Sequence, residues 1–240
     1  MAILSPLKLA RNLWLRVLPK LCYFQSGEGI RHEAPPETGW MMTPATAQGF
    51  FFCSCAAIGE RGKMDSYLEL PIGDSAPEIV TAIVEIPQDS VNKYEYDLDL
   101  KVFVLDRNLH SPIHYPGDYG FITQTIAQDG DPLDILVLGD GPSFTGCLCK
   151  TRPIGLFEML DNGTCDEKII AYAAGNPRYV DLANYTDIRP HILREIDHFF
   201  AVYKDLEGEQ TKVLGWKDRD AAYEVIRSSH ERFLNKHLTR

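Results

Sequence analysis

Eight short apolar runs, each bounded by Asn, Asp, Gly or Pro, constrain the fold of this 240-residue chain more than any other feature. Runs of this length between turn-forming residues are typical of β-strands. They span residues 79–87, 94–96, 102–105, 119–125, 135–138, 154–159, 168–173 and 213–216. Many short strands at this spacing predict a barrel.

Two segments depart from the strand pattern and show the spacing of amphipathic helices. The apolar residues of the first are Ile192, Leu193, Ile196, Phe199, Phe200 and Tyr203, and those of the second are Ala221, Ala222, Val225, Ile226 and Phe233. Thr186 or Asp187 is expected to cap the first helix, because Pro190 follows in its first turn. The predicted fold class is α+β, mainly β, with two helices.

The charges are distributed unevenly along the chain. Residues 1–63 carry seven Lys or Arg and four Asp or Glu, whereas residues 64–240 carry seventeen and thirty. The strongly acidic part argues against nucleic acid as a partner, because binding to a phosphate backbone needs basic surfaces. The composition of the whole chain, with 45% hydrophobic and 24% charged residues, is typical of one main globular domain.

The segment 1–63 is predicted to be an extension that precedes a domain spanning residues 64–240. Residues 1–27 combine leucines with four basic residues and no acidic residue, which is the composition of an amphipathic targeting segment. An organelle presequence (mitochondrion or plastid) is one interpretation. The other is that the extension is non-native or upstream sequence and that Met64 is the functional start. Charges every few residues exclude a membrane span.

The six cysteines favour a reducing compartment over a disulfide framework. No C-x-x-C pair occurs, and Cys147 and Cys149 are expected to face the same side of a strand as free thiols. Neither a zinc site nor disulfide bonds are therefore expected.

The segment Asp129-Gly130-Asp131-Pro132-Leu133-Asp134 places three carboxylates just before the apolar run 135–138. Gly and Pro disfavour both a regular helix and an ordinary ladder strand. Carboxylates this close repel one another unless a cation lies among them, and hard divalent ions prefer such oxygen ligands. An EF-hand is excluded, because Asp134 and Asp140 stand where that loop needs Gly and Glu. A D-x-D glycosyltransferase site and a two-metal phosphodiesterase site remain open on these residues alone.

Other charged and aromatic residues occur within or beside the predicted strands. In chain order, the motifs are Val84-Glu85-Ile86-Pro87, Lys93-Tyr94-Glu95, Asp106-Arg107, Tyr115-Pro116 with Tyr119-Gly120, the acidic segment 129–134, Arg152-Pro153-Ile154-Gly155, Asp161 and Asp166 before Lys168, and His198-Phe199-Phe200 before Tyr203-Lys204-Asp205-Leu206. Taken in this order, from about residue 70 to 236, they resemble the family I soluble inorganic pyrophosphatases.

This resemblance implies a fold, an activity and a set of functional residues. The implied fold is an OB-like five-stranded barrel with two helices, and the implied activity is Mg²⁺-dependent hydrolysis of pyrophosphate to two phosphates. The residues implied to face metal ions are Glu85, Asp129, Asp131, Asp134, Asp161 and Asp166, with Asp131 closest to the attacking water. Those implied to contact substrate or line the cavity are Lys93, Glu95, Arg107, Tyr115, Tyr119, Lys168, Tyr203 and Lys204.

The charges of these residues support a requirement for metal. Seven carboxylates outnumber four cations, and pyrophosphate adds further negative charge, so on the order of three to four Mg²⁺ ions are expected with substrate. A binding module without chemistry would instead need a basic, aromatic groove. A phosphodiesterase would lack the Lys, Arg and Tyr residues that hold a second free phosphate.

The resemblance also leads to expectations about assembly and location. The part of the chain after Met64 has the short length of bacterial-type members, and the resemblance to these implies a homo-oligomer, a hexamer with closed symmetry. Contacts between subunits are expected from the apolar residues of the two helices, including Ile192, Phe199, Phe233 and Leu234. The expected location is the cytoplasm, or an organelle if residues 1–27 are a presequence, and no membrane partner is expected.

Overall fold

The structure, a computed structural model, describes residues 66–238, so the predicted extension and its boundary at Met64 lie outside the described residues. The strands within this range are β1 (Val80–Ile86), β2 (Asn92–Asp97), β3 (Val102–Asn108), β4 (Asp118–Ile122), β5 (Asp134–Leu138), β6 (Leu148–Asp161), β7 (Thr164–Ala173) and β8 (Thr211–Lys217). The helices are α1 (Pro190–Val202) and α2 (Arg219–Leu238), with three short 3₁₀ turns, η1 (Tyr67–Glu69), η2 (Tyr185–Asp187) and η3 (Asp205–Glu207). Each predicted strand and helix is therefore confirmed.

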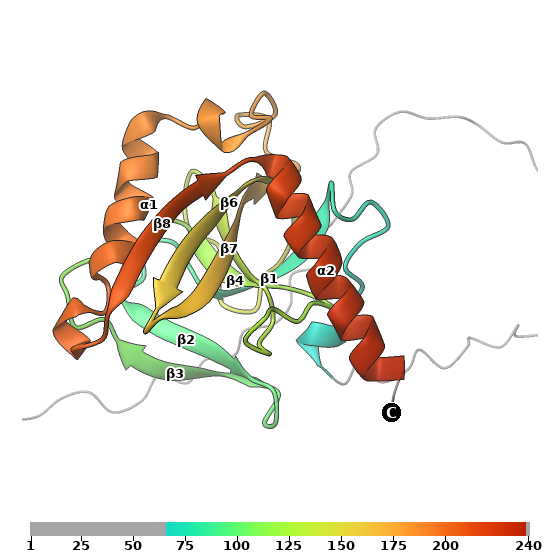
Figure 1. The fold of residues 1–240 in the computed structure, drawn as a ribbon, viewed down its shortest axis with the longest axis horizontal. Helices are drawn as coiled ribbons and strands as arrows, with labels where there is room; N and C mark the ends of the chain where they lie inside the picture. The colour runs from blue at the N-terminus through green and yellow to red at the C-terminus, as the bar shows by residue number, and fades with distance from the viewer. Residues whose placement is uncertain (1–65, 239–240) are drawn as a thin grey trace, which may run out of the picture. The chain divides into compact units, whose positions relative to one another are not determined.

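Five strands close into a barrel in the order β1-β4-β5-β7-β6, because β6 also pairs with β1 (Figure 1). The β5–β7 pair is parallel and the other pairs of the barrel are antiparallel. β8 extends the sheet beyond β6, and β2 and β3 form a separate hairpin. The predicted OB-like barrel of five strands is confirmed.

Closure of the barrel depends on local departures from regular strand geometry. The pairing of β6 with β7 shifts register between Pro153 and Gly155, so the two halves of β6 can pair with different strands on its other edge. The first half pairs with β1 and the second with β8. At Gly120 a Cβ atom would lie 1.9 Å from the carbonyl oxygen of Ile83, so only glycine permits this approach of β4 to β1.

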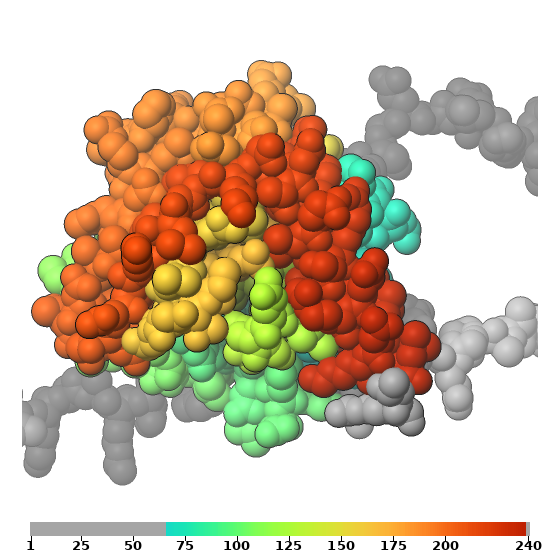
Figure 2. All heavy atoms as spheres, in the orientation of Figure 1, coloured from blue at the N-terminus to red at the C-terminus, as the bar shows by residue number. Residues whose placement is uncertain are grey.

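The two helices pack on different parts of the sheet, and each buries part of its apolar face. α1 packs against β8, and α2 packs against β6. In Figure 2, the yellow β6–β7 region remains visible between the orange α1 and the red α2. Phe199 and Phe233 are only 4% exposed within the chain itself. They therefore cannot supply the subunit contacts expected of them, whereas Leu234 is 44% exposed. No helix within residues 66–238 is long and apolar enough to cross a membrane.

The start of α1 differs from the sequence prediction. The helix begins at Pro190 with Arg189 as its N-cap, and no side chain caps it. Asp187 instead accepts hydrogen bonds from the backbone N–H groups of Ala183 and Asn184, in a capping box around η2. Pro190 lacks an N–H group and has a fixed φ, so it can begin the helix with less need for a cap.

Candidate active site

A cavity of about 340 Å³ brings together side chains from distant parts of the sequence. β1, β2, β4, β5, β6 and β7 contribute to its walls, together with the loop before β5 and the residues that follow α1. The predicted site residues that line it are Glu85, Lys93, Glu95, Tyr115, Tyr119, Asp129, Asp131, Asp134, Asp161, Asp166, Lys168, Tyr203 and Lys204. Arg107 is the one predicted site residue that does not line the cavity. The glycosyltransferase, phosphodiesterase and pyrophosphatase interpretations of the acidic segment would therefore all place the active site in this cavity.

Lys168 is buried at the base of the cavity and uses all three of its donors. Its Nζ donates to Asp134 Oδ2 at 2.7 Å, to Asp166 Oδ1 at 2.8 Å and to Tyr119 Oη at 2.9 Å. The parallel register of β5 and β7 sets Asp134 directly beside Lys168. Burial alone would lower the pKa of Lys168, but the two carboxylates outweigh it and raise the pKa. Lys168 is therefore a cation at neutral pH.

Glu85 is a carboxyl group of the cavity whose pKa is strongly raised. It accepts a hydrogen bond from the backbone N–H of Tyr96 at 2.7 Å. Burial is the main cause that raises the pKa of Glu85 to about 8, and the nearby charges of Asp134 and Glu95 add to it. In the metal-free protein, Glu85 is therefore mainly protonated at neutral pH.

Glu85 gives the metal-free protein a predicted pH dependence of stability. Because its folded pKa is raised above the ordinary value, the folded state binds more protons than the unfolded state between about pH 4.5 and 8. Its contribution to the free energy of unfolding therefore falls as the pH rises through this window. We expect urea unfolding in EDTA to show this fall for the wild type and a weaker fall for Glu85→Gln. The exposed Glu231→Gln should retain the wild-type slope, and an equal slope in Glu85→Gln would contradict this assignment.

The acidic loop before β5 holds Asp129 and Asp131 at the mouth of the cavity. Gly130, between them, has a φ of 101°, which favours glycine. The backbone N–H of Asp131 donates to Asp129 Oδ1 at 3.1 Å, so the turn is closed by its own carboxylate. Partial burial raises the pKa of Asp131, and the charges of Asp129 and Asp134 raise it further. This carboxyl group is therefore a better proton acceptor than an ordinary aspartate.

Lys204 and Asp161 form a second ion pair on the wall of the cavity. Lys204 Nζ lies 2.6 Å from Asp161 Oδ2 and 3.0 Å from Glu209 Oε2. The other oxygen of Asp161, Oδ1, is buried without a hydrogen-bond partner. Such a buried acceptor is costly unless a donor or cation reaches it. It is thus available to a ligand.

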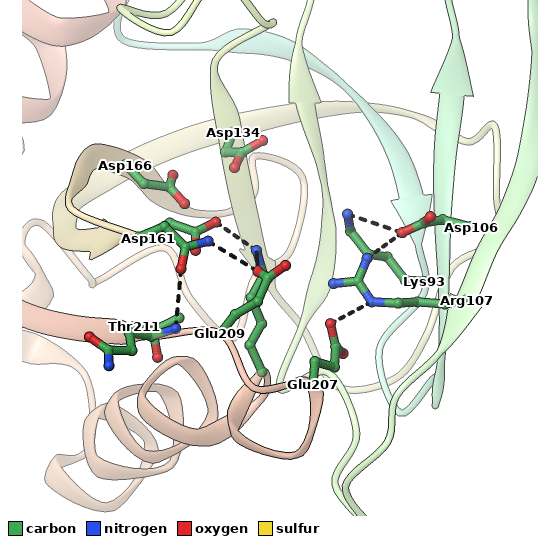
Figure 3. A network of polar contacts seen from close by, with 12 residues as sticks. Lys93, Asp106, Arg107, Asp134, Asp161, Asp166, Glu207, Glu209 and Thr211 are labelled. Carbon is green, nitrogen blue, oxygen red and sulfur yellow. Dashed lines mark hydrogen bonds and ion pairs between the residues drawn. The ribbon is translucent and has the colours of Figure 1, made fainter.

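Arg107 lies beside the cavity in a group with Lys93, Asp106 and Glu207 (Figure 3). Its Nη1 contacts Asp106, and its Nε lies 2.9 Å from Glu207 Oε2. Lys93 contacts Glu95 and lies 3.4 Å from Asp106. The sequence did not indicate roles for Asp106, Glu207 or Glu209, although Asp106 directly precedes Arg107 and the other two follow Lys204 within five positions. Only the structure shows that they pair with the predicted cations.

The donor set of the cavity fits hard divalent cations. Among the described residues, no three His, Cys, Asp or Glu side chains converge on one point as a preformed metal site. The carboxylates are instead distributed around the cavity, and Asp161 Oδ1 has no partner. Mg²⁺ commonly binds in this way, through one or two carboxylates together with water and substrate phosphates.

Comparison with known proteins identifies the family. Residues 82–234 match the family model described as inorganic pyrophosphatase. The chain belongs to the inorganic pyrophosphatase family. It is 49% identical over 148 residues to the inorganic pyrophosphatase of Synechocystis sp., a match that covers 62% of this chain and 88% of that relative. The inorganic pyrophosphatase of Halalkalibacterium halodurans is 45% identical over 157 residues, covering 65% of this chain and 96% of the relative.

Solved structures of the family have the same fold. The inorganic pyrophosphatase of Thermus thermophilus superposes with a TM-score of 0.67 at 45% identity, covering 69% of this chain and 97% of that chain. The type I inorganic pyrophosphatase of Toxoplasma gondii is only 21% identical and has a TM-score of 0.64, which shows the shared fold alone. The predicted resemblance to family I is confirmed by these comparisons.

Proposed function

We propose that the chain hydrolyses inorganic pyrophosphate to two orthophosphates in a reaction that depends on Mg²⁺. The observation that supports this most strongly is the mixture of charges around one cavity. Cationic side chains suited to phosphate oxygens lie among carboxylates suited to divalent ions. Membership of the inorganic pyrophosphatase family supports the same reaction.

The ion pairs of the site support a requirement for metal. Lys168 and Lys204 are each paired with carboxylates, and Lys93 and Arg107 contact Asp106. A substrate with a charge of about −3 to −4 would therefore enter a cavity whose cations are already neutralised. We propose that on the order of three to four Mg²⁺ ions offset this charge when substrate is bound.

The metal-facing residues are proposed to be Glu85, Asp129, Asp131, Asp134, Asp161 and Asp166. When bound, Mg²⁺ would polarise phosphate oxygens and lower the pKa of a water molecule so that it becomes a nucleophile at neutral pH. Asp131 is proposed to orient this water and accept its proton. Glu95 and Tyr115 shape the cavity.

The phosphate groups are proposed to be held by the cations and phenols. Lys93, Arg107, Lys168 and Lys204 would stabilise charge on the leaving phosphate. Burial raises the pKa of Tyr203 to about 12, and burial raises the pKa of Tyr119 also, so both stay protonated. Tyr119 donates its hydroxyl hydrogen to Asp134 Oδ2, whereas Tyr203 can donate to a phosphate oxygen. A phosphodiester needs no second set of free-phosphate contacts, so this set favours pyrophosphate.

The decisive experiment is a substrate panel with purified full-length chain. We expect phosphate release from pyrophosphate with Mg²⁺ at neutral pH, none after EDTA treatment, and inhibition by Ca²⁺. Ca²⁺ prefers larger and more flexible coordination than Mg²⁺, so it should occupy the carboxylates without supporting turnover. Nucleoside triphosphates and a phosphodiester should react far more slowly. A folded protein that cleaves the diester but releases no phosphate from pyrophosphate would overturn the proposal.

The domain boundary, assembly and location are further proposals. The family match lies within residues 82–234, which supports a catalytic domain over residues 64–240 preceded by an extension. The domain is proposed to form a homo-oligomer, specifically a hexamer, in the cytoplasm or in an organelle reached through residues 1–27. Light scattering of a chain that begins at Met64 tests the assembly. The mass of the mature N-terminus in cells tests the fate of the extension.

A further inference from the structure

Glu207 is a largely buried carboxylate that no role proposed above explains. It ends the 3₁₀ turn η3, which follows Lys204 directly, and its side chain is 9% exposed. The left-handed Gly208, with a φ of 80°, then turns the chain away toward β8. Glu207 thus lies on the same segment as Tyr203 and Lys204, which line the cavity.

The contact of Glu207 is with Arg107 on β3. Glu207 Oε2 lies 2.9 Å from Arg107 Nε as an ion pair, and neither Arg107 Nε nor the buried Glu207 Oε1 has a hydrogen-bond partner within residues 66–238. Burying a carboxylate is unfavourable unless a cation compensates it. Among the described residues, the ion pair with Arg107 is the interaction that compensates the charge of Glu207.

Two carboxylates together fix the orientation of the guanidinium group. Asp106 contacts Nη1, while Glu207 lies on the Nε side. In Figure 3, the remaining amino group of Arg107 is turned toward the side where Asp161 and Glu209 lie. A guanidinium group has donors on several edges, so one edge stays available for a phosphate oxygen while the others are held.

We propose that Glu207 is a positioning residue that holds Arg107 in the orientation needed to contact a phosphate group of the substrate. This inference rests on the proposed hydrolysis of pyrophosphate. Without Glu207, the long Arg107 side chain would sample several rotamers, and substrate binding would have to order it. The Glu207 carboxylate also neutralises part of the positive charge of Arg107, which weakens the attraction between Arg107 and the substrate. The two effects act in opposite directions, and the proposal holds that orientation outweighs neutralisation.

Steady-state kinetics of Glu207→Gln test which effect dominates. We expect KM for magnesium pyrophosphate to rise about tenfold, because the substrate would have to order the released Arg107 side chain, with kcat within about threefold of wild type. Glu195→Gln is the matched control and should leave both constants unchanged, because the Glu195 side chain on α1 is 56% exposed. Thermal melting of each variant shows whether it is folded. A fall in KM would overturn the proposal, because Glu207 would then weaken Arg107 by competition.

A double-mutant cycle tests whether Glu207 acts through Arg107. Arg107→Gln should raise KM, and Arg107→Gln/Glu207→Gln should have the same KM as Arg107→Gln alone. Additive increases would mean that Glu207 acts by another route and would overturn the inference. If Arg107→Gln has the KM of wild type, Arg107 makes no phosphate contact and the inference also fails, although pyrophosphate hydrolysis stands. Absence of phosphate release by the wild type would instead refute the proposed function itself.

Discussion

Replacing Asp131 by Asn is expected to lower kcat for pyrophosphate hydrolysis by about 10²-fold or more. Asparagine keeps the size of the side chain and an oxygen ligand, but it cannot accept a proton from the attacking water. General-base assistance is typically worth about 10² to 10⁴ in rate. Asp131 is suited to this role because it lies at the mouth of the cavity, and burial and neighbouring carboxylates raise its pKa.

The loss in Asp131→Asn has two candidate causes, because Asp131 is also a proposed metal ligand. Phosphate release measured over a range of Mg²⁺ concentrations separates them. A lost ligand should be offset by high Mg²⁺, whereas a lost base should leave kcat low at saturation. Asp140→Asn alters an aspartate outside the cavity and should behave as wild type. If Asp131→Asn turns over within about threefold of wild type at saturating Mg²⁺, another group must act as the base.

The local elements of the fold could be predicted from the sequence, since each depends on nearby residues. The apolar run 135–138 and the acidic loop before it lie where their pattern indicates, with β5 beginning at Asp134. The sequence also predicts that the side chains of Cys147 and Cys149 face the same side, and their sulfur atoms lie 3.8 Å apart. Cys149 lies in β6 and Cys147 directly precedes that strand, so the alternation of strand side chains predicts this placement.

The long-range features could not be predicted from pattern. Closure of the barrel requires the shift between Pro153 and Gly155, and the pairing of β6 with β1 follows from that three-dimensional bend. Five-strand closure was predicted only through the family resemblance. The pairing of Glu207 with Arg107 joins residues one hundred positions apart, and neither residue type identifies its partner. The cap of α1 was predicted wrongly because Asp187 satisfies the nearer turn η2.

Lys168→Met is expected to lower the free energy of unfolding of the metal-free protein by about 3 kcal/mol, since removing one partner of a buried ion pair leaves an uncompensated charge. Methionine fills a similar volume, so packing should change little. Lys168 is only 2% exposed, and it separates the carboxylates of Asp134 and Asp166. Without it, these two partly buried groups repel each other.

The same repulsion predicts that Mg²⁺ should recover part of the stability lost by Lys168→Met. A divalent ion can replace the missing positive charge between Asp134 and Asp166, whereas a loss caused by poor packing would not respond to metal. Urea unfolding in EDTA and in Mg²⁺ measures both states. Lys217→Met is the matched control, because Lys217 also pairs with a carboxylate, Glu158 at 2.7 Å, but is 54% exposed. Exposed pairs contribute little, so this variant should unfold near the wild-type midpoint. An unchanged midpoint for Lys168→Met in EDTA would show that the buried lysine does not hold the two carboxylates together.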